Sequence, residues 1–289
     1  MTIDNALAPQ RMKIELDDGS LTGLRWPAPG RAPLLFLHAT GFCASAYRQM
    51  LGALAGRFDI HALDLRGHGG NTRPADPSRL RSWKPYASDA RAYLDRESRG
   101  GWIVAGHSMG AVTAVMAARG RTDIAALKLI EPVAMPGWMN FAAATPVWPL
   151  FSGSMPMVRQ AASRRDRWPD RQSVIASYAR KALFRDWAPG ALEDYLADGL
   201  VEEEGQVRLS CNPQWEAATF AALANDFWGA LAAAPAPVSV LAVDHRSSTV
   251  FPAARKRLRR LGAALEVKKG AGHLAPMEKP AELAAFLAD

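Results

Sequence analysis

The chain has 289 residues, a formal net charge of +7 and 49% hydrophobic residues. This length predicts one large domain, or a core with an inserted subdomain, and the composition is typical of a globular protein with a sizeable core. The two cysteines, Cys43 and Cys211, exclude a disulfide framework, and no Cys/His spacing typical of a metal site occurs. We therefore expect a cytoplasmic, reducing compartment and no metal.

Residues 1–20 lack a basic start and an apolar core segment, which predicts no signal peptide, and no run of 18 apolar residues predicts a membrane span. Basic residues gather at 159–172 and 255–260. Such runs can mark nucleic-acid or anionic-membrane surfaces. Aspartates interrupt the first run, however, and neither carries a nucleic-acid motif. We interpret both as solvated arginine-rich faces and expect no nucleic-acid partner, while the oligomeric state stays open.

Short apolar runs alternate with helical patterns along most of the chain. A hairpin is predicted at 13–26, with its turn at Asp17-Asp18-Gly19. The predicted strands are 34–37, 58–65, 102–106, 127–131, 238–243 and 264–268. The predicted helices are 43–56, 85–98, 108–119, 252–261 and 279–288. The strands are mostly aliphatic with little alternation, which is typical of a parallel sheet covered on both faces. The sequence therefore predicts a three-layer α/β fold.

The alternation stops between residues 133 and 233. Six of the nine tryptophans lie there, and several prolines are interpreted as breakers of regular structure. Helices are predicted at 172–184, 189–198 and 213–224. We expect 1–132 and 234–289 to form the α/β core and 133–233 to form an inserted helical cap.

Ser108 is the candidate nucleophile. It lies in "GHSMG" (106–110), between a buried strand and an alanine-rich helical pattern. A G-x-S-x-G sequence in this strand–turn–helix context is the nucleophile elbow, in which glycines allow a sharp turn. The following helix start offers unpaired N–H groups, so the N–H of Met109 is a candidate oxyanion donor.

A serine hydroxyl needs a base to remove its proton. His273 is the best candidate among six histidines, because it follows the last predicted strand in a glycine-flanked loop, "KKGAGHLAP". His107 adjoins Ser108 in sequence but should point elsewhere from the turn. His38, His61, His68 and His245 are assigned no catalytic role.

Four motifs of the sequence resemble those of α/β-hydrolase fold proteins and occur in the same chain order. They are "LHATGF" (37–42), "LDLRGHG" (63–69), "GHSMG" (106–110) and "GAGH" (270–273). The resemblance implies an eight-stranded, mostly parallel sheet with helices on both faces. It also implies a catalytic triad at the carboxyl ends of the strands, in the order Ser, acid, His. The second oxyanion donor of such proteins comes from the first loop, where the N–H of Thr40 is our candidate. Ala39 replaces the usual glycine and would be strained if its φ were positive.

The acid departs from the commonest pattern of these proteins. They usually carry an aspartate a few residues after the penultimate strand, where this chain has "DHRSST" (244–249). Asp244 comes earlier than usual. Glu131 ends the strand next to the nucleophile strand, and some cap-bearing relatives use a glutamate there. We favour Glu131 and keep Asp244 as the alternative.

The sequence thus predicts a serine hydrolase that cleaves a small-molecule carboxylic ester through an acyl-enzyme, with no metal or organic cofactor. Aromatic residues, among them Trp138 and Phe42, are candidates for contacts with an apolar acyl, aryl or lactone substrate. Three alternatives remain open. They are a hydrolase of carbon–carbon bonds, an acyltransferase and a non-catalytic ligand-binding protein of the same fold.

Overall fold

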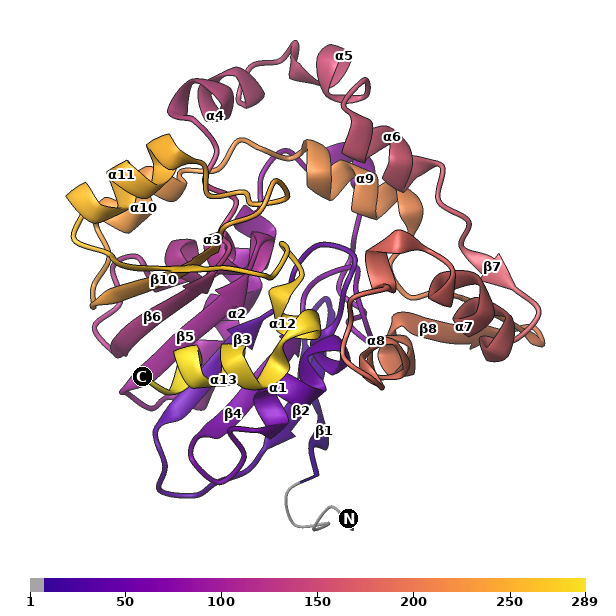
Figure 1. Cartoon of the computed structure of the whole chain (residues 1–289), viewed down its shortest axis with the longest axis horizontal. Coiled ribbons are helices and arrows are strands. Elements are labelled where there is room, and N and C mark those ends of the chain that lie inside the picture. Colours follow the sequence, from indigo (N-terminus) through magenta and orange to yellow (C-terminus); the bar gives the residue numbers. More distant parts are fainter. Residues whose placement is uncertain (1–7) are drawn as a thin grey trace.

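The computed structural model describes residues 8–289. Eight strands form one sheet in the order β1-β2-β4-β3-β5-β6-β10-β11 (Figure 1). The strands are β1 (Gln10–Leu16), β2 (Gly19–Trp26), β3 (Pro33–Leu37), β4 (Asp59–Asp64), β5 (Trp102–His107), β6 (Ile124–Ile130), β10 (Val238–Val243) and β11 (Ala264–Lys268). The hairpin β1–β2 is antiparallel and pairs antiparallel with β4, whereas all pairs from β4 to β11 are parallel. The predicted sheet is confirmed. The signal-peptide expectation rests partly on residues 1–7, which lie outside the described residues.

Helices cover both faces of the sheet, as Figure 1 shows. They are α1 (Arg48–Gly52), α2 (Lys84–Glu97), α3 (Met109–Ala118), α11 (Pro252–Arg260), α12 (Ala275–Glu278) and α13 (Pro280–Ala288). Alternate side chains of β3 enter two separate cores: Leu35 and Leu37 contact one, Leu34 and Phe36 the other. This alternation explains why the strand is apolar throughout, because each face is covered.

The helix predicted at 43–56 is shorter and irregular. A 3-10 turn, η2 (Ala44–Tyr47), leads into α1, which ends at Gly52, and Gly56 then adopts a left-handed φ of 78°. Two glycines so close together disfavour a longer helix.

The segment 133–233, called the insert below, lies between β6 and β10. Its helices are α4 (Gly137–Ala143), α5 (Trp148–Ser152), α6 (Pro156–Ala162), α7 (Arg171–Ala179), α8 (Ala191–Gly199), α9 (Pro213–Ala221) and α10 (Phe227–Ala232). The insert also contains a small antiparallel sheet that the sequence analysis did not predict. Its strands, in spatial order, are β7 (Arg167–Trp168), β9 (Gln206–Leu209) and β8 (Leu200–Glu203). Pro149 and Pro156 lie in the first turns of α5 and α6, because proline is tolerated where its missing N–H costs nothing.

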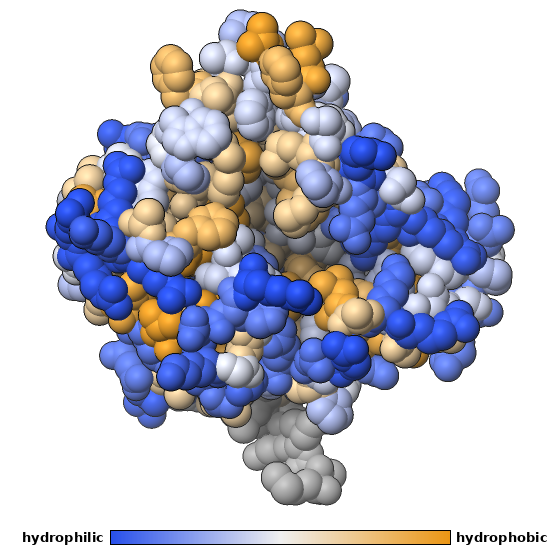
Figure 2. Space-filling model, turned by 45° about the horizontal axis from the view of Figure 1, so that its top comes forward, coloured by the Kyte–Doolittle hydropathy of each residue, from blue (hydrophilic) through white to orange (hydrophobic). Residues whose placement is uncertain are grey.

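Helices α4 to α6 form the arch at the top of Figure 1. Several large apolar side chains are exposed on this arch, and Figure 2 shows apolar surface there between hydrophilic flanks. They are Trp138, Phe141, Val147, Leu150, Phe151 and Met157. Among residues 8–289, no helix is long and apolar enough to cross a membrane.

The turn between β5 and α3 depends on two glycines at backbone contacts. A Cβ on Gly106 would lie 2.3 Å from the carbonyl oxygen of Gly110, and a Cβ on Gly110 would lie 2.1 Å from that of Leu37. Backbone atoms cannot move aside as a flexible side chain can, so the strand and helix could not keep this approach.

We therefore predict that Gly106→Ala and Gly110→Ala each lower the free energy of unfolding by about 3 kcal/mol or more, as overpacking against backbone does. Gly153→Ala is the matched control, because Gly153 has a φ of −60° and its Cβ would have no neighbour within 4 Å. Urea unfolding of the three variants measures the difference. Equal stability of the Gly110 variant and the control would contradict this account of the turn.

Candidate active site

Ser108 lies on the sharp turn between β5 and α3. Its backbone has φ 57° and ψ −116°, and its N–H donates to the carbonyl oxygen of Ile130, 2.9 Å away on β6. Positive φ is costly for a residue with a side chain and persists only where the surroundings enforce it. The turn thus projects the hydroxyl away from the sheet at the start of α3.

The structure brings Ser108, His273 and Glu131 into one hydrogen-bonded line. The Nε2 atom of His273 lies 2.9 Å from Oγ of Ser108, and its Nδ1 atom lies 3.1 Å from Oε2 of Glu131. A carboxylate can only accept, so Nδ1 carries the proton that is donated to Glu131. In the neutral ring Nε2 is then the acceptor that faces the serine hydroxyl, which is the tautomer that a general base requires.

Glu131 is completely buried, with 0% of its surface exposed, and has a left-handed φ of 45°. Its carboxylate accepts hydrogen bonds from the N–H of Val243 at 2.7 Å, from Oγ of Ser248 at 2.8 Å and from the N–H of Thr249 at 2.9 Å. Burial alone would raise the pKa of Glu131, but the bond from His273 and these backbone donors outweigh it and hold the pKa below its ordinary value. The carboxylate is therefore charged at neutral pH.

Asp244 lies apart from this line. It is exposed, and none of the hydrogen bonds within residues 8–289 joins its side chain to His273. The sequence analysis missed the role of the residues that follow it. Ser248 and Thr249 lie in the loop where the resemblance led us to expect the acid, and they donate to Glu131. The absence of an acid from "HRSST" was the available signal.

The N–H groups of Thr40 and Met109 have no hydrogen-bond acceptor within the described part of the chain, so both remain available to a ligand. The neighbouring amides are occupied: Ala39 donates to Oη of Tyr47 at 3.0 Å, and Gly41 donates to Nε2 of His68 at 3.1 Å. The left-handed residue of this loop is Gly41, with φ 78°, and Ala39 is not among the residues with positive φ. The strain considered for Ala39 does not arise.

A buried ion pair supports the same loop from the insert. The guanidinium of Arg164 binds both carboxylate oxygens of Glu216, at 3.1 and 2.8 Å, and the hydroxyls of Tyr178 and Tyr195. Tyr195 in turn donates to the carbonyl oxygen of Gly41 at 3.1 Å. The interpretation of 159–172 as a solvated face is thus wrong at Arg164, whose partners come from distant parts of the insert and could not be read from the run itself.

The two candidate substrate contacts lie in different settings. Trp138 is 68% exposed on α4. Phe42 is partly buried, and its ring centroid lies 5.2 Å from that of Tyr195 and 5.9 Å from that of Trp187. The structure therefore places Phe42 beside the loop of Thr40, whereas Trp138 is exposed on α4.

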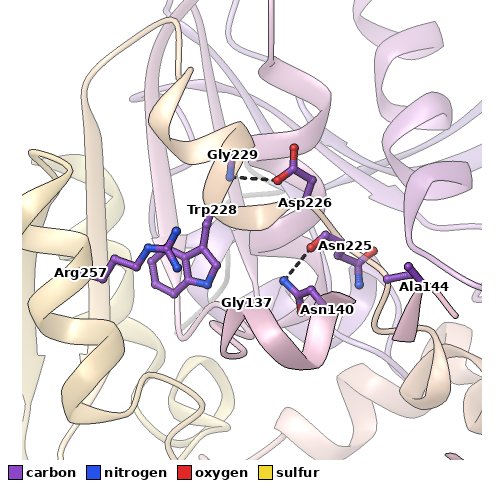
Figure 3. A pocket seen from close by; sticks show the side chains of 9 residues that line it. Gly137, Asn140, Ala144, Asn225, Asp226, Trp228, Gly229 and Arg257 are labelled. Atoms are coloured by element: carbon purple, nitrogen blue, oxygen red, sulfur yellow. Dashed lines mark hydrogen bonds between the residues drawn. The ribbon is translucent and has the colours of Figure 1, made fainter. Parts of the chain in front are cut away.

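A separate hollow of about 510 Å³ lies between α4, α10 and α11 (Figure 3). Arg257 covers the ring of Trp228 at 4.4 Å, the side-chain amide of Asn140 donates to the carbonyl oxygen of Asn225, and Asp226 accepts from the N–H of Gly229. Ser108, Glu131 and His273 do not line it. Because its polar groups are largely paired with each other, we assign it no function.

No group of three or more His, Cys, Asp or Glu residues within 8–289 is arranged to hold a metal ion.

Comparison with known proteins identifies the family and supports the fold. The profile described as "Alpha/beta hydrolase family" matches residues 34–286. A curated relative, the 2-(acetamidomethylene)succinate hydrolase of Mesorhizobium japonicum, is 32% identical over 110 residues, which span 38% of this chain and only 38% of the relative. The crystal structure of an E-2-(acetamidomethylene)succinate hydrolase superposes with a TM-score of 0.79 at 20% identity, covering 96% of this chain and 97% of that one. The N-formylmaleamic acid deformylase of Pseudomonas putida S16 superposes with a TM-score of 0.66 at 20% identity, covering 93% and 96%.

Amide substitutions of Glu131 and Asp244 are expected to have different effects on kcat. Glu131→Gln keeps the shape of the side chain but removes its charge and can favour the wrong imidazole tautomer, which costs about 10⁴ in kcat in the known serine protease case. We expect a loss of at least about 10³ in kcat for Glu131→Gln and less than about tenfold for Asp244→Asn. Both variants are compared with one substrate at one pH. A large loss of kcat in Asp244→Asn together with a normal kcat in Glu131→Gln would reverse the assignment.

Proposed function

The chain belongs to the α/β-hydrolase family, and we propose that it is a serine hydrolase in which Ser108 is the nucleophile, His273 the general base and Glu131 the acid that orients the histidine. One observation carries the proposal: the continuous line from Oγ of Ser108 through both ring nitrogens of His273 to Oε2 of Glu131, with contacts of 2.9 and 3.1 Å. This set activates a serine without any further group.

In the proposed reaction, His273 takes the proton of Ser108 as Oγ attacks the substrate's carbonyl carbon. The N–H groups of Thr40 and Met109 bind the oxyanion that forms. His273 then gives its proton to the leaving group, and an acyl-enzyme remains. Water attacks the acyl-enzyme with His273 again as base, which releases the acid product and restores Ser108. Glu131 stabilises the imidazolium in both steps.

We propose a carboxylic ester as the first substrate class, with an apolar acyl or aryl group. Apolar side chains exposed on α4 to α6 support an apolar substrate, because the insert is proposed to act as a cap over the site. The buried free thiols Cys43 and Cys211 support a reducing, cytoplasmic compartment.

A second candidate class is an N-acyl amide of a dicarboxylic acid. The names of two similar proteins, an acetamidomethylene-succinate hydrolase and an N-formylmaleamic acid deformylase, favour it. Esters and amides both react through a tetrahedral intermediate with an oxyanion, although the leaving atom is oxygen in the first and nitrogen in the second. Turnover of a series of p-nitrophenyl esters compared with turnover of N-formylmaleamic acid separates them.

The nucleophile is tested by Ser108→Ala. We expect a loss of about 10⁴–10⁶ in kcat, as for other triad nucleophiles, without loss of the fold. A fluorophosphonate probe should label the wild type at Ser108 and leave the variant unlabelled. Turnover by Ser108→Ala within tenfold of wild type would rule out the mechanism, and circular dichroism of the variant checks its fold.

The proposed cap is tested with two tryptophans that differ in burial. Trp138 is 68% exposed, whereas Nε1 of Trp148 donates to the carbonyl oxygen of Ala221 at 2.8 Å. We expect Trp138→Ala to change the preference for acyl chain length severalfold at unchanged Tm, and Trp148→Ala to lower Tm. Kinetics on p-nitrophenyl esters with about 2 to 12 acyl carbons provide the measurement. An unchanged chain-length profile of Trp138→Ala would remove this residue from the substrate site.

A further inference from the structure

His107 precedes the candidate nucleophile and uses both of its ring nitrogens inside the protein. The ring is completely buried; its Nδ1 lies 2.8 Å from Oη of Tyr47 and its Nε2 lies 2.8 Å from the carbonyl oxygen of His273. Burial, and next to it the nearby ring of His273, hold the pKa of His107 well below its ordinary value, so the ring is neutral.

The direction of these bonds follows from their chemistry. A carbonyl oxygen only accepts, so Nε2 of His107 carries the proton and donates it to His273. Nδ1 of the neutral ring must then accept, and the hydroxyl of Tyr47 donates to it. A lone pair of the Tyr47 Oη accepts a hydrogen bond from the N–H of Ala39 at 3.0 Å. A single chain of three hydrogen bonds thus joins the backbone of Ala39 to the backbone of His273.

The two ends of this chain lie beside the reacting groups. Ala39 directly precedes Thr40, whose N–H is the proposed oxyanion donor, and the other end is the carbonyl of the proposed general base itself. Tyr47 comes from η2 and His107 from the end of β5, so this chain of hydrogen bonds joins the loop of Ala39, η2, the end of β5 and the loop of His273.

We propose that Tyr47 and His107 are positioning residues, which fix the oxyanion loop and the loop of His273 relative to Ser108. This inference rests on the proposed function. Donors of an oxyanion hole act only when they are already aimed at the position of the developing charge, and removing one such donor costs about 10²–10³ in kcat. A donor that is displaced rather than removed loses part of this effect. The loop also keeps the bond that the N–H of Gly41 donates to His68 and the bond that its carbonyl oxygen accepts from Tyr195, so we expect a partial loss of kcat.

The principal test is Tyr47→Phe, which removes the hydroxyl and keeps the ring. Tyr93→Phe is the matched control, because Tyr93 is also a buried tyrosine whose hydroxyl contacts Nδ1 of a histidine, His61, and His61 has no bond to the site. On an ester that the wild type hydrolyses, we expect Tyr47→Phe to lower kcat about 10- to 50-fold with KM within threefold. Tyr93→Phe should keep kcat within twofold whatever its Tm.

Inhibitor binding separates positioning from a general loss of structure. A trifluoromethyl ketone forms a tetrahedral adduct with the serine and places an oxyanion in the hole, whereas the carboxylic acid product does not. For Tyr47→Phe, the Ki of the ketone should rise by the factor by which kcat/KM falls, while the Ki of the product stays unchanged. Equal rises in both constants would mean that the hydroxyl is only structural and would overturn the proposal.

Two substitutions of His107 test the chain from its other side and remain informative if Tyr47→Phe is unstable. His107→Asn places an amide near Nδ1 and can keep the bond with Tyr47, and His107→Gln places one near Nε2 and can keep the bond with His273. Each breaks one bond of the chain and should lower kcat about three- to tenfold. Where Tyr47→Phe is stable, His107→Gln combined with it should lose less than the product of the single losses, because both break one chain.

The outcome also separates this inference from the proposed function. If a fluorophosphonate fails to label wild-type Ser108, the proposed mechanism is wrong and the positioning role falls with it. If the wild type is labelled and Tyr47→Phe and the His107 variants match it in kcat and in ketone Ki, only the positioning role is wrong.

Discussion

The carboxylate of Glu131 is excluded from solvent, and a buried charge is tolerated only where hydrogen-bond donors surround it. Five donor groups meet that demand: the imidazole of His273, the N–H of Val243, the hydroxyl of Ser248, and the N–H and hydroxyl of Thr249. The same donors therefore draw the loop after β10 and the loop after β11 against the end of β6. The hydrogen bonds that this one buried carboxylate requires thus bring the parts of the site together.

A second feature of the site is that two of its supports are buried, neutral histidines. His107 links the backbone of His273 to Tyr47, and His68 holds the N–H of Gly41; burial lowers the pKa of both histidines, that of His68 to about 4. Their hydrogen-bonding pattern is thus insensitive to pH changes near neutrality. His273 differs from both, because its side chain is 20% exposed.

Local patterns in the sequence predicted most of this arrangement, because chain order and strand ends determine where loops meet. The elbow at 106–110 and the place of His273 needed only the strand–turn–helix context and the order of motifs. The supporting contacts could not be predicted in this way, since Tyr47 and His107 are 60 residues apart and Arg164 and Glu216 are 52 apart. Pairings at such distances depend on packing, which periodicity does not encode. The short strands of the insert escaped prediction because they lack the length that shows alternation.

The position of Glu131 at the end of β6 has a consequence for how this fold can diversify. The loop of residues 244–249, which follows β10, carries no acid of the line and provides two hydroxyl donors and one amide donor to its carboxylate. A backbone N–H is available from almost any residue, so the fixed requirements of this loop are the hydroxyls of Ser247, Ser248 and Thr249, which bond to His273 and Glu131. Recombination or directed evolution could exchange residues 244–246 to reshape the neighbourhood of His273, provided that Ser247 is kept, because its hydroxyl accepts the N–H of His273 at 2.9 Å. The charge that orients the imidazole would stay untouched on the adjoining strand.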